Sequence, residues 1–421
     1  MRKQDAILIS DPAPAPIRTC RGDSRLYDDP PLNLPQSVLY ATSSRLGGYG
    51  LDLHSLEALR GPYREGILGR AICYHNRQTE IPSARIRSLR WHPVRLLSFL
   101  ETKYYYGAKK HYMDWIGARE LATGAYDFYH GWSGESLRIL REARRRGIPG
   151  IIEIPTWHRN KGKDKPARLT KSERERAAAR GTQGALNRLL ISRQYHLEEY
   201  ELATLILAYS ECAEETFLSA GVAREKLFYI PLAADIERFT PGTAPEIFRA
   251  VYVGALIKRK GVHHLLEAWH RLNLKDAELV LVGAVHDEIK PYLQEFGGPT
   301  VRVAGFAAKP EDYYRSATVH VFPSTCEGSA KVTYDAAACG LAQITTRESG
   351  DVVIDGVNGL VVPANDPGAL AAAIERLYRD RDLAARFGVA ARQRVVENFT
   401  WDRFRARLLE AYSLALTRRT A

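Results

Sequence analysis

Short apolar runs alternate with longer amphipathic stretches along the chain from Ser37 onward. The runs favour strands, and the stretches between them, whose apolar positions recur at helical spacing, favour helices. This alternation is typical of βα units that build a parallel sheet. In the first half we expect strands at 38–41, 70–74, 128–130, 151–154, 204–209 and 227–230, with helices that include 51–60, 134–146 and 212–220.

The second half repeats the same alternation after a Pro- and Gly-containing stretch at 240–246, which we interpret as a linker. Its expected strands are 250–253, 279–282, 301–304, 318–322, 343–345 and 360–362, and Thr400 is placed to cap a last helix at 401–416. The pattern predicts an α/β protein with two doubly wound halves, whose ligands bind at the carboxyl ends of the strands. We expect an irregular leader (1–36), an N-terminal domain (37–240), a C-terminal domain (241–398) and a terminal helix segment (399–421).

Residues 322–340 carry the most distinctive chemistry. An apolar strand runs into a turn with Glu327 and Gly328, and a helix is expected to open near Ser329 and to carry Asp335 on its second turn. Unpaired N–H groups at a helix start attract anions, and Gly328 lets the backbone approach a ligand closely. Two carboxylates on either side of a bound phosphate could hold the hydroxyls of a sugar and a ribose. This segment therefore suggests a nucleotide-sugar site.

The same segment resembles the Glu-x7-Glu signature of glycosyltransferase family 4, with Asp335 where the second Glu usually stands. The resemblance extends through a strand, Gly and Lys-Gly loop at 253–262, a helix at 265–269, a strand and turn at 278–283, and a turn and final strand at 355–363. It implies a retaining enzyme of the GT-B fold, with two Rossmann-like domains facing a central cleft. It also implies a C-terminal helix that crosses back to the first domain.

The resemblance implies roles for individual residues of the second half. Glu327 would hold hydroxyls of the transferred sugar, and Asp335, although one methylene shorter than Glu, would bind the ribose. Lys260 would neutralise the charge that grows on the departing diphosphate. Arg259 or Lys258 would supply a second cation, because Ala255 stands where many relatives carry Arg. The full expected donor-binding set is Gly254, Arg259, Lys260, Glu327, Gly328, Ser329, Ala330, Lys331, Val332 and Asp335. The alternative interpretations are a helix-terminal acid for Glu327 and a solvated basic turn for Lys260.

Three positions of the first half are candidates for the acceptor side. Gly47 and Gly48 follow the first expected strand, where family members carry a Gly-Gly loop that faces donor phosphate and acceptor; a plain tight turn is the alternative. His130 is a candidate catalytic residue near the reacting sugar, although many relatives place that His where this chain has Trp132. His158 follows another strand. For both histidines, a satisfied core position is the competing interpretation.

Basic residues are concentrated in the first half of the chain. The chain of 421 residues has a net charge of +11, and residues 51–200 alone hold 28 Lys and Arg against 16 Asp and Glu. This asymmetry predicts an anionic partner for the first half. Residues 85–112 interleave basic and aromatic side chains in a way that suits an anionic membrane surface, and Pro93 is placed to start a helix there. The basic segment 159–180 is expected to be a mobile loop followed by a polar helix. We expect no nucleic-acid partner, because no recognised nucleic-acid module surrounds these residues.

No apolar run approaches the ~20 residues that span a bilayer, and the chain starts without a signal-peptide pattern. We therefore expect a cytoplasmic protein, peripheral on the inner face of the membrane if it meets lipid. Asp380 and Asp382 fit a metal-binding Asp-x-Asp motif of another fold, but they lie between two helical segments and are expected to form a capped turn. We expect no obligatory metal and no obligatory cofactor beyond the nucleotide-sugar donor.

These patterns and the resemblance together favour a retaining glycosyltransferase. Its donor would be a UDP- or GDP-linked sugar, and its acceptor a glycan or lipid-linked saccharide of cell-envelope or exopolysaccharide synthesis. Two alternatives stay open at this point: another GT-B nucleotide-sugar enzyme such as an epimerase, and a non-catalytic GT-B binding protein.

Overall fold

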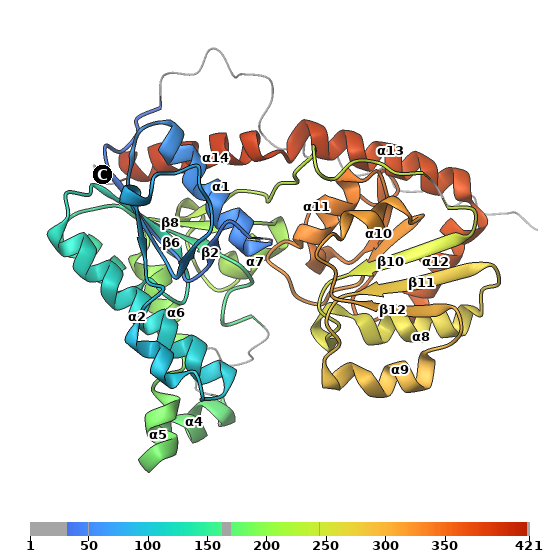
Figure 1. Cartoon of the computed structure of the whole chain (residues 1–421), viewed down its shortest axis with the longest axis horizontal. Coiled ribbons are helices and arrows are strands. Elements are labelled where there is room, and N and C mark those ends of the chain that lie inside the picture. The colour runs from blue at the N-terminus through green and yellow to red at the C-terminus, as the bar shows by residue number, and fades with distance from the viewer. Residues whose placement is uncertain (1–31, 49, 162–169, 244, 419–421) are drawn as a thin grey trace, which may run out of the picture. The chain divides into compact units, whose positions relative to one another are not determined.

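The computed structural model describes residues 32–48, 50–161, 170–243 and 245–418. Two parallel sheets organise the chain from Asn33 onward (Figure 1). Most of the expected leader and the start of the basic segment after Lys161 lie outside the described residues.

The first sheet has seven strands in the order β5-β3-β1-β6-β7-β8-β9, all parallel. Their bounds are β1 Val38–Ala41, β3 Leu68–Cys73, β5 Ile86–Ser88, β6 Phe128–Trp132, β7 Gly150–Ile154, β8 Leu205–Ala208 and β9 Leu227–Tyr229. A separate two-stranded ribbon pairs β2 (Arg45–Leu46) with β4 (His75–Asn76). The helices of this half are α1 Leu51–Arg64, α2 Thr102–Thr123, α3 Leu137–Arg145, α4 Lys171–Ala178, α5 Gly181–Asn187, α6 Arg193–Leu202 and α7 Glu211–Leu218.

The second sheet has six parallel strands in the order β12-β11-β10-β13-β14-β15. They are β10 Phe248–Val253, β11 Ala277–Val282, β12 Val301–Gly305, β13 Val319–Phe322, β14 Ala342–Thr345 and β15 Gly359–Val361. Its helices are α8 Val262–Leu272, α9 Lys290–Phe296, α10 Glu311–Arg315, α11 Lys331–Ala338, α12 Pro367–Arg379 and α13 Arg381–Asn398. Short 3-10 turns occupy Ser83–Arg85, Pro93–Leu97, Arg224–Lys226, Lys258–Lys260, Asp287–Ile289 and Arg347–Ser349.

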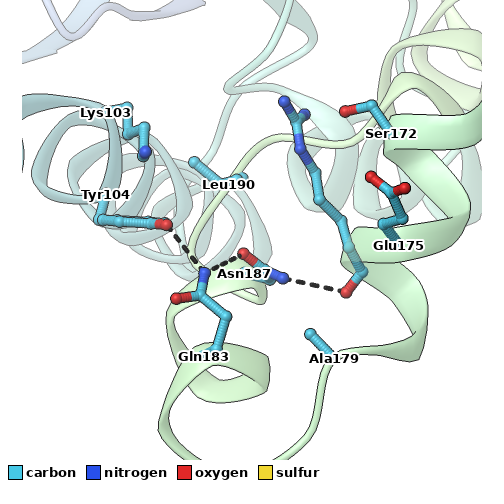
Figure 2. Close-up of a pocket in the computed structure, with 9 residues that line it drawn as sticks. Lys103, Tyr104, Ser172, Glu175, Ala179, Gln183, Asn187 and Leu190 are labelled. Carbon is cyan, nitrogen blue, oxygen red and sulfur yellow. Dashed lines mark hydrogen bonds between the residues drawn. The ribbon is translucent and has the colours of Figure 1, made fainter.

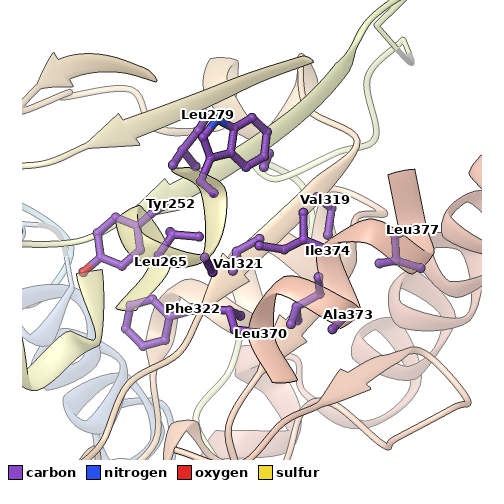
Figure 3. Packing of buried hydrophobic residues seen from close by; sticks show 14 of the residues in the cluster. Tyr252, Leu265, Leu279, Val319, Val321, Phe322, Leu370, Ala373, Ile374 and Leu377 are labelled. Carbon is purple, nitrogen blue, oxygen red and sulfur yellow. The ribbon is translucent and has the colours of Figure 1, made fainter. Parts of the chain in front are cut away.

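Apolar side chains of the central strands and flanking helices form the core of the second sheet (Figure 3). Val319 and Val321 of β13 and Leu279 of β11 are fully buried, as is Leu265 of α8. Burial of such side chains contributes about 1.5–3 kcal/mol each, so this half supplies a rigid platform for the loops at its strand ends.

Helix α14 (Trp401–Thr417) returns to the first sheet, as the resemblance implies (Figure 1). Thr400 caps its start by accepting the Arg403 N–H at 3.4 Å. Further along, Arg405 forms an ion pair with Glu57 of α1, and the Tyr412 hydroxyl lies 2.9 Å from His130 Nδ1. The terminal helix therefore belongs to the packing of the first sheet.

Three expected helix starts differ in the structure by different amounts. The helix expected at 134–146 begins at Leu137, because the carboxylate of Glu199 holds the N–H groups of Gly134 and Ser136 at 2.7 and 2.8 Å outside the helix. The helix expected to open near Ser329 begins at Lys331, close to the expected place. Pro93 starts only a 3-10 turn, and the long helix α2 opens nine residues later at Thr102. The domain boundaries expected at residues 36, 240 and 398 stay a prediction.

Candidate functional site

The expected donor residues lie where the strand order of the second sheet reverses. The chain adds β11 and β12 on one side of β10, then crosses to β13 on its other side. Ligands of open parallel sheets bind at such a switch point, beyond the carboxyl ends of the strands. The loop after β10 carries Arg259 and Lys260, and the loop after β13 carries Glu327, so neighbouring strands bring the two together.

Hydrogen bonds join these two loops. The carbonyl oxygen of Arg259 accepts the Thr325 N–H and the Thr325 hydroxyl, both at 2.9 Å, and the Ser324 hydroxyl at 3.2 Å. Gly261 has a left-handed φ of 71°, and a Cβ built there would lie 2.0 Å from the Pro323 carbonyl oxygen. Only glycine fits this position, which fixes the basic loop against the turn.

Glu327 is held by cations and a hydroxyl. Its Oε1 accepts hydrogen bonds from Arg259 Nη1 at 3.0 Å and Ser324 Oγ at 3.2 Å, and lies 3.3 Å from Lys260 Nζ. Its backbone N–H donates to the Glu348 carbonyl at 3.1 Å. The side chain is 12% exposed, so this carboxylate is ordered by its neighbours before any ligand arrives.

Lys260 stands beside the carboxyl end of β10. Its Nζ lies 5.0 Å from the centroid of the Phe322 ring, and its side chain is 18% exposed. Gly254, directly after β10, has a φ of 148°, and a Cβ built there would lie 3.6 Å from Lys260 Cδ. A partly desolvated ammonium at a switch point suits a diphosphate, because its interaction with charge is stronger than in water.

The start of α11 leaves N–H groups unused. Within the described parts of the chain, the N–H groups of Gly328, Ser329, Lys331 and Val332 have no acceptor. The Ala330 N–H donates to the Ser349 carbonyl at 2.8 Å. The sequence placed Ala330 in the donor-binding set, but this N–H group is not free for a ligand. The remaining groups lie at the positive end of the helix dipole, which favours an anion.

Gly328 has a different neighbour from the one expected. A Cβ built there would lie 2.7 Å from the Pro155 carbonyl oxygen and 3.1 Å from the Thr156 nitrogen. The Gly328 carbonyl also accepts the hydroxyl of Ser210. In this structure Gly328 therefore permits close approach of the loops after β7 and β8.

Asp335 is paired within its own helix. Its carboxylate forms an ion pair with Lys331, one turn earlier, and the two side chains are 11% and 18% exposed. Burial raises the pKa of Asp335, and Lys331 opposes that rise. A ribose hydroxyl would therefore have to share this carboxylate with Lys331.

The structure places His130 in the interior of the first sheet. The residue has no exposed surface; its Nδ1 lies 2.9 Å from the Tyr412 hydroxyl and its Nε2 lies 3.1 Å from Glu153 Oε1. Both ring nitrogens thus face protein groups. This geometry agrees with the core interpretation and does not bring His130 to a surface that a sugar could reach.

His158 is also packed inside. It is 5% exposed, its ring lies against Tyr200 and Phe217, and its Nδ1 accepts the Asn160 N–H at 3.1 Å. Burial lowers its pKa to about 4, so the ring is neutral at pH 7. Here too the core interpretation fits the geometry.

The glycine loop that follows β2 packs against Gln78 and Asp52. Gly47 has φ of 86°, and a Cβ there would lie 2.9 Å from the Gln78 nitrogen; one at Gly48 would lie 2.7 Å from Asp52 Oδ2. Asp52 Oδ1 accepts the Arg45 N–H at 2.9 Å. These contacts fit a tight turn, and residue 49 lies outside the described residues, so the loop's part in substrate binding stays a prediction.

The sequence reasoning missed Glu153, a fully buried carboxylate on β7. His54 Nε2 and the Tyr209 hydroxyl each lie 2.5 Å from its Oε2. Burial alone would raise the pKa of Glu153, but His54 and His130 outweigh burial and hold it below its ordinary value. A charged residue in the middle of an apolar strand was the available signal, because a buried charge requires partners.

A distinct cavity of about 340 Å³ lies among α2, α4 and α5 (Figure 2). Gln183 Nε2 donates to the Tyr104 hydroxyl at 3.0 Å and to Asn187 Oδ1 at 2.9 Å on its wall. None of the expected site residues lines this cavity. It is therefore separate from the switch-point loops.

The described residues offer neither a metal-binding cluster nor a membrane-spanning helix. In those parts of the chain, no three His, Cys, Asp or Glu side chains gather into a metal-binding group. Asp380 caps α13 by accepting the Leu383 N–H at 2.7 Å, as expected for a turn. None of the described helices has the length and apolar character needed to cross a bilayer.

Comparison with known proteins identifies the half that carries these loops. Residues 248–380 match the model of the family described as glycosyl transferases group 1. This part of the chain is therefore similar to a group 1 glycosyltransferase domain, and the protein is a glycosyltransferase. The chain is also 28% identical over 314 residues to alpha-maltose-1-phosphate synthase of Mycobacterium tuberculosis, an alignment that covers 70% of this chain and 75% of the relative.

Solved structures show the fold. Sucrose-phosphate synthase from Thermosynechococcus elongatus superposes with a TM-score of 0.67 at 19% identity, over 90% of this chain and 98% of that one. HepE of Anabaena, in complex with UDP and glucose, gives a TM-score of 0.62 at 16% identity, over 89% and 99%. The glycosyltransferase domain therefore belongs to a GT-B architecture of two Rossmann-like domains, which confirms the predicted fold class.

Proposed function

We propose that this glycosyltransferase belongs to the retaining family 4 and moves a sugar from a nucleotide-sugar donor to a hydroxyl of an acceptor. The observation that carries the proposal is the arrangement at the switch point, where Glu327 contacts Arg259, Lys260 and Ser324 beside unused N–H groups of α11. Residues 241–398 would bind the donor, and residues 37–240 would hold the acceptor.

In this mechanism the second half binds and polarises the donor. The free N–H groups of Ser329, Lys331 and Val332 and the ammonium of Lys260 hold the diphosphate. Asp335 takes the ribose, and Glu327 takes hydroxyls of the sugar. These fixed charges stabilise the negative charge that develops on the leaving diphosphate, which is the main requirement of the step.

The transfer breaks the bond between the anomeric carbon and the diphosphate oxygen and forms a bond from that carbon to the acceptor oxygen. The acceptor's hydroxyl proton leaves with the diphosphate. Retention of configuration requires attack on the face that the leaving group vacates, without an assigned carboxylate nucleophile. Orientation of the acceptor and exclusion of water then supply much of the rate.

The proposal also names the nucleotide of the donor and the chemical class of the acceptor. The fold shared with HepE makes UDP the first nucleotide to test, with GDP second. The acceptor is a glycan or lipid-linked saccharide, consistent with a role in cell-envelope or exopolysaccharide synthesis. No metal and no further cofactor takes part in the proposed step.

Release of nucleoside diphosphate tests the proposal. The full-length chain would be supplied with UDP- and GDP-sugars, with and without candidate acceptors, beside the variants Glu327→Gln and Glu397→Gln; Glu397 is an exposed acid on α13. We expect acceptor-dependent release that falls by orders of magnitude only in Glu327→Gln. Isomerised donor without acceptor dependence would favour an epimerase, and tight binding without turnover would favour a binding protein.

A peripheral position on the cytoplasmic face of a membrane is the last part of the proposal. Trp91, Leu96 and Phe99 are 81%, 79% and 79% exposed within nine residues. The guanidinium groups of Arg90 and Arg95 lie 5.7 and 5.1 Å from the centroid of the Trp91 ring. Exposed aromatic and aliphatic side chains beside cations suit an anionic bilayer interface.

Vesicle co-sedimentation tests this part separately. We expect binding to vesicles of phosphatidylglycerol and phosphatidylcholine that weakens with salt and is lost in a Trp91→Ser/Phe99→Ser double variant. Phe306→Ser is the matched control, because Phe306 is equally exposed, at 79%, in the second half. An equal loss of vesicle binding in the Phe306→Ser control, or vesicle binding that does not depend on lipid charge, would argue for a soluble acceptor.

A further inference from the structure

Five cations around His75 and the start of α2 lack a carboxylate partner in the part of the chain that the structure describes. Among the ion pairs of the described residues, none within 4.0 Å involves Arg45, Arg77, Arg90, Lys109 or Lys110, which we call the basic cluster. Other arginines of the same half are paired: Arg70 and Arg87 both contact Glu120, at 2.9 and 2.6 Å. Other described cations of this half, Arg138 among them, also lack an ion pair, so the cluster is distinguished by its common location and not by the absence of partners.

The two-stranded ribbon and α2 bring members of the cluster together. Arg45 of β2 is paired in register with His75 of β4. Tyr74, next to His75, donates its hydroxyl hydrogen to the Lys109 carbonyl at 2.6 Å, and Lys109 Nζ lies 4.1 Å from the centroid of the Tyr74 ring. After burial, Arg45 and Lys109 are the first causes that lower the pKa of His75, which shows that their positive charges act on one place.

Two of these cations are also partly withdrawn from water. Lys109 and Lys110 are half-buried on α2. Burial, followed by the charge of Arg45, lowers the pKa of Lys109. A half-buried ammonium without an ion pair costs free energy, and a bound anion would offset that cost.

A buried carboxylate adjoins the cluster. Glu135 is 2% exposed; its Oε1 accepts the Ser43 N–H at 2.6 Å, and its Oε2 has no hydrogen-bond partner among the described residues. Lys110 Nζ lies 3.1 Å from the place a Cβ would take on Gly134, the residue before Glu135. Lys110 and Glu135 thus lie near each other without forming an ion pair, and Glu135 retains an oxygen that can accept a hydrogen bond.

The position within the sheet relates this group to the donor loop. Ser43 and Arg45 follow β1, and Glu135 follows β6; these strands are neighbours, and the strand order of the first sheet reverses between them. The next strand, β7, leads into Pro155, whose carbonyl lies against Gly328 of the donor loop. The group therefore lies at the switch point of the first sheet, one strand away from a strand end that contacts the donor loop.

We infer that the basic cluster and Glu135 form an acceptor subsite for a phosphate-bearing, hydroxylated molecule, with Arg45, Lys109 and Lys110 on the phosphate and Glu135 on a hydroxyl. The inference rests on the proposed function and names the class of its acceptor. Several cations around one place match the charge of a phosphate, and the fork of Arg45 suits its oxygens. The phosphate group is common to a soluble sugar phosphate and to a lipid-linked saccharide.

Calorimetric titration with inorganic phosphate tests the subsite while excess UDP occupies the donor loops. The proteins are the full chain and the variants Lys109→Met, Arg45→Gln and Lys103→Gln. Lys109→Met keeps the apolar stem against Tyr74. Lys103 is the matched control, since it is an exposed cation of the same helix that pairs with Glu101. UDP affinity, measured alongside, reports whether each variant is folded.

We expect Lys109→Met and Arg45→Gln each to weaken phosphate binding by about tenfold or more, with UDP affinity unchanged, and Lys103→Gln to have no effect. Glycerol 1-phosphate and phosphatidylglycerol vesicles form the second arm. Competition by the first indicates a soluble acceptor, and competition by the second alone indicates a lipid-linked one. No phosphate binding, or equal weakening in all three variants, would overturn the inference. Absence of binding of both UDP and GDP would instead refute the proposed function.

Discussion

Replacement of Gly328 by alanine offers a steric test of the contact between the donor loop and the first half. The added methyl carbon would lie 2.7 Å from the Pro155 carbonyl oxygen, whereas ordinary contacts of a Cβ begin at 3.4 Å. The loop or Pro155 must therefore move by about 0.7 Å, because a backbone carbonyl cannot rotate away as a flexible side chain would. Overpacking of this kind costs about 1–3 kcal/mol of stability.

The displacement acts directly on the site. Glu327 and Ser329 flank Gly328, and the Gly328 carbonyl holds the Ser210 hydroxyl. A shift approaching 1 Å in a positioning group can reduce turnover by about 100-fold, so we expect Gly328→Ala to lose about tenfold to 100-fold of its transfer rate. UDP affinity should fall as well, because the Ser329 N–H lies on the displaced loop, but by less than the rate, because Lys260 lies on the other loop.

Gly298→Ala is the matched control, since a Cβ there meets nothing within 4 Å and its φ is compatible with alanine. Initial rates of nucleotide release and thermal unfolding would be measured for both variants. Ser210→Ala removes the hydrogen bond without adding an atom and should cause a smaller loss. Wild-type turnover in Gly328→Ala would refute the reasoning that this contact positions Glu327.

Three further predictions concern Asp335, His158 and the need for a metal ion. Asp335→Ala should weaken UDP binding about tenfold and leave pyrophosphate binding unchanged, because the carboxylate is assigned to the ribose; equal loss for both ligands in calorimetry would contradict that assignment. His158 is neutral in the fold, with a pKa of about 4 against an ordinary value of 6.5, so its contribution to stability is present above pH 6.5 and is lost as the pH falls through 4. Denaturant unfolding should show a shallower acid loss for His158→Phe than for the wild type, and parallel pH profiles would disprove it. Dialysis against EDTA should leave nucleotide release unchanged; a loss restored by a divalent ion would refute the prediction of no obligatory metal.

Most of the architecture could be predicted from local pattern. The expected strands at 38–41 and 279–282 match β1 and the core of β11, because buried parallel strands are short apolar runs between turn residues. The order of the strands within each sheet could not be predicted from the sequence, because it depends on crossover connections and long-range pairing. Helix α2 was not predicted, because its tyrosines and lysines give no clear apolar face.

Part of the candidate site could likewise be predicted from the sequence, and part could not. The spacing around Glu327 indicated a carboxylate at a helix start, and the structure adds Arg259, Ser324 and Lys260 as its partners. The environment of His130 could not be predicted, because one partner, Tyr412, comes from a helix 282 residues away in sequence. Contacts of this kind decide whether a histidine at a strand end is buried or accessible.

The role of Lys260 beside Glu327 is tested most directly by the affinity of UDP for Lys260→Met, measured by calorimetry next to the wild type. Loss of one charge-assisted hydrogen bond, worth about 1.5–3 kcal/mol, should weaken binding by about tenfold to 100-fold. Equal affinity of the two proteins for UDP would contradict the account, because the nucleotide would then bind elsewhere.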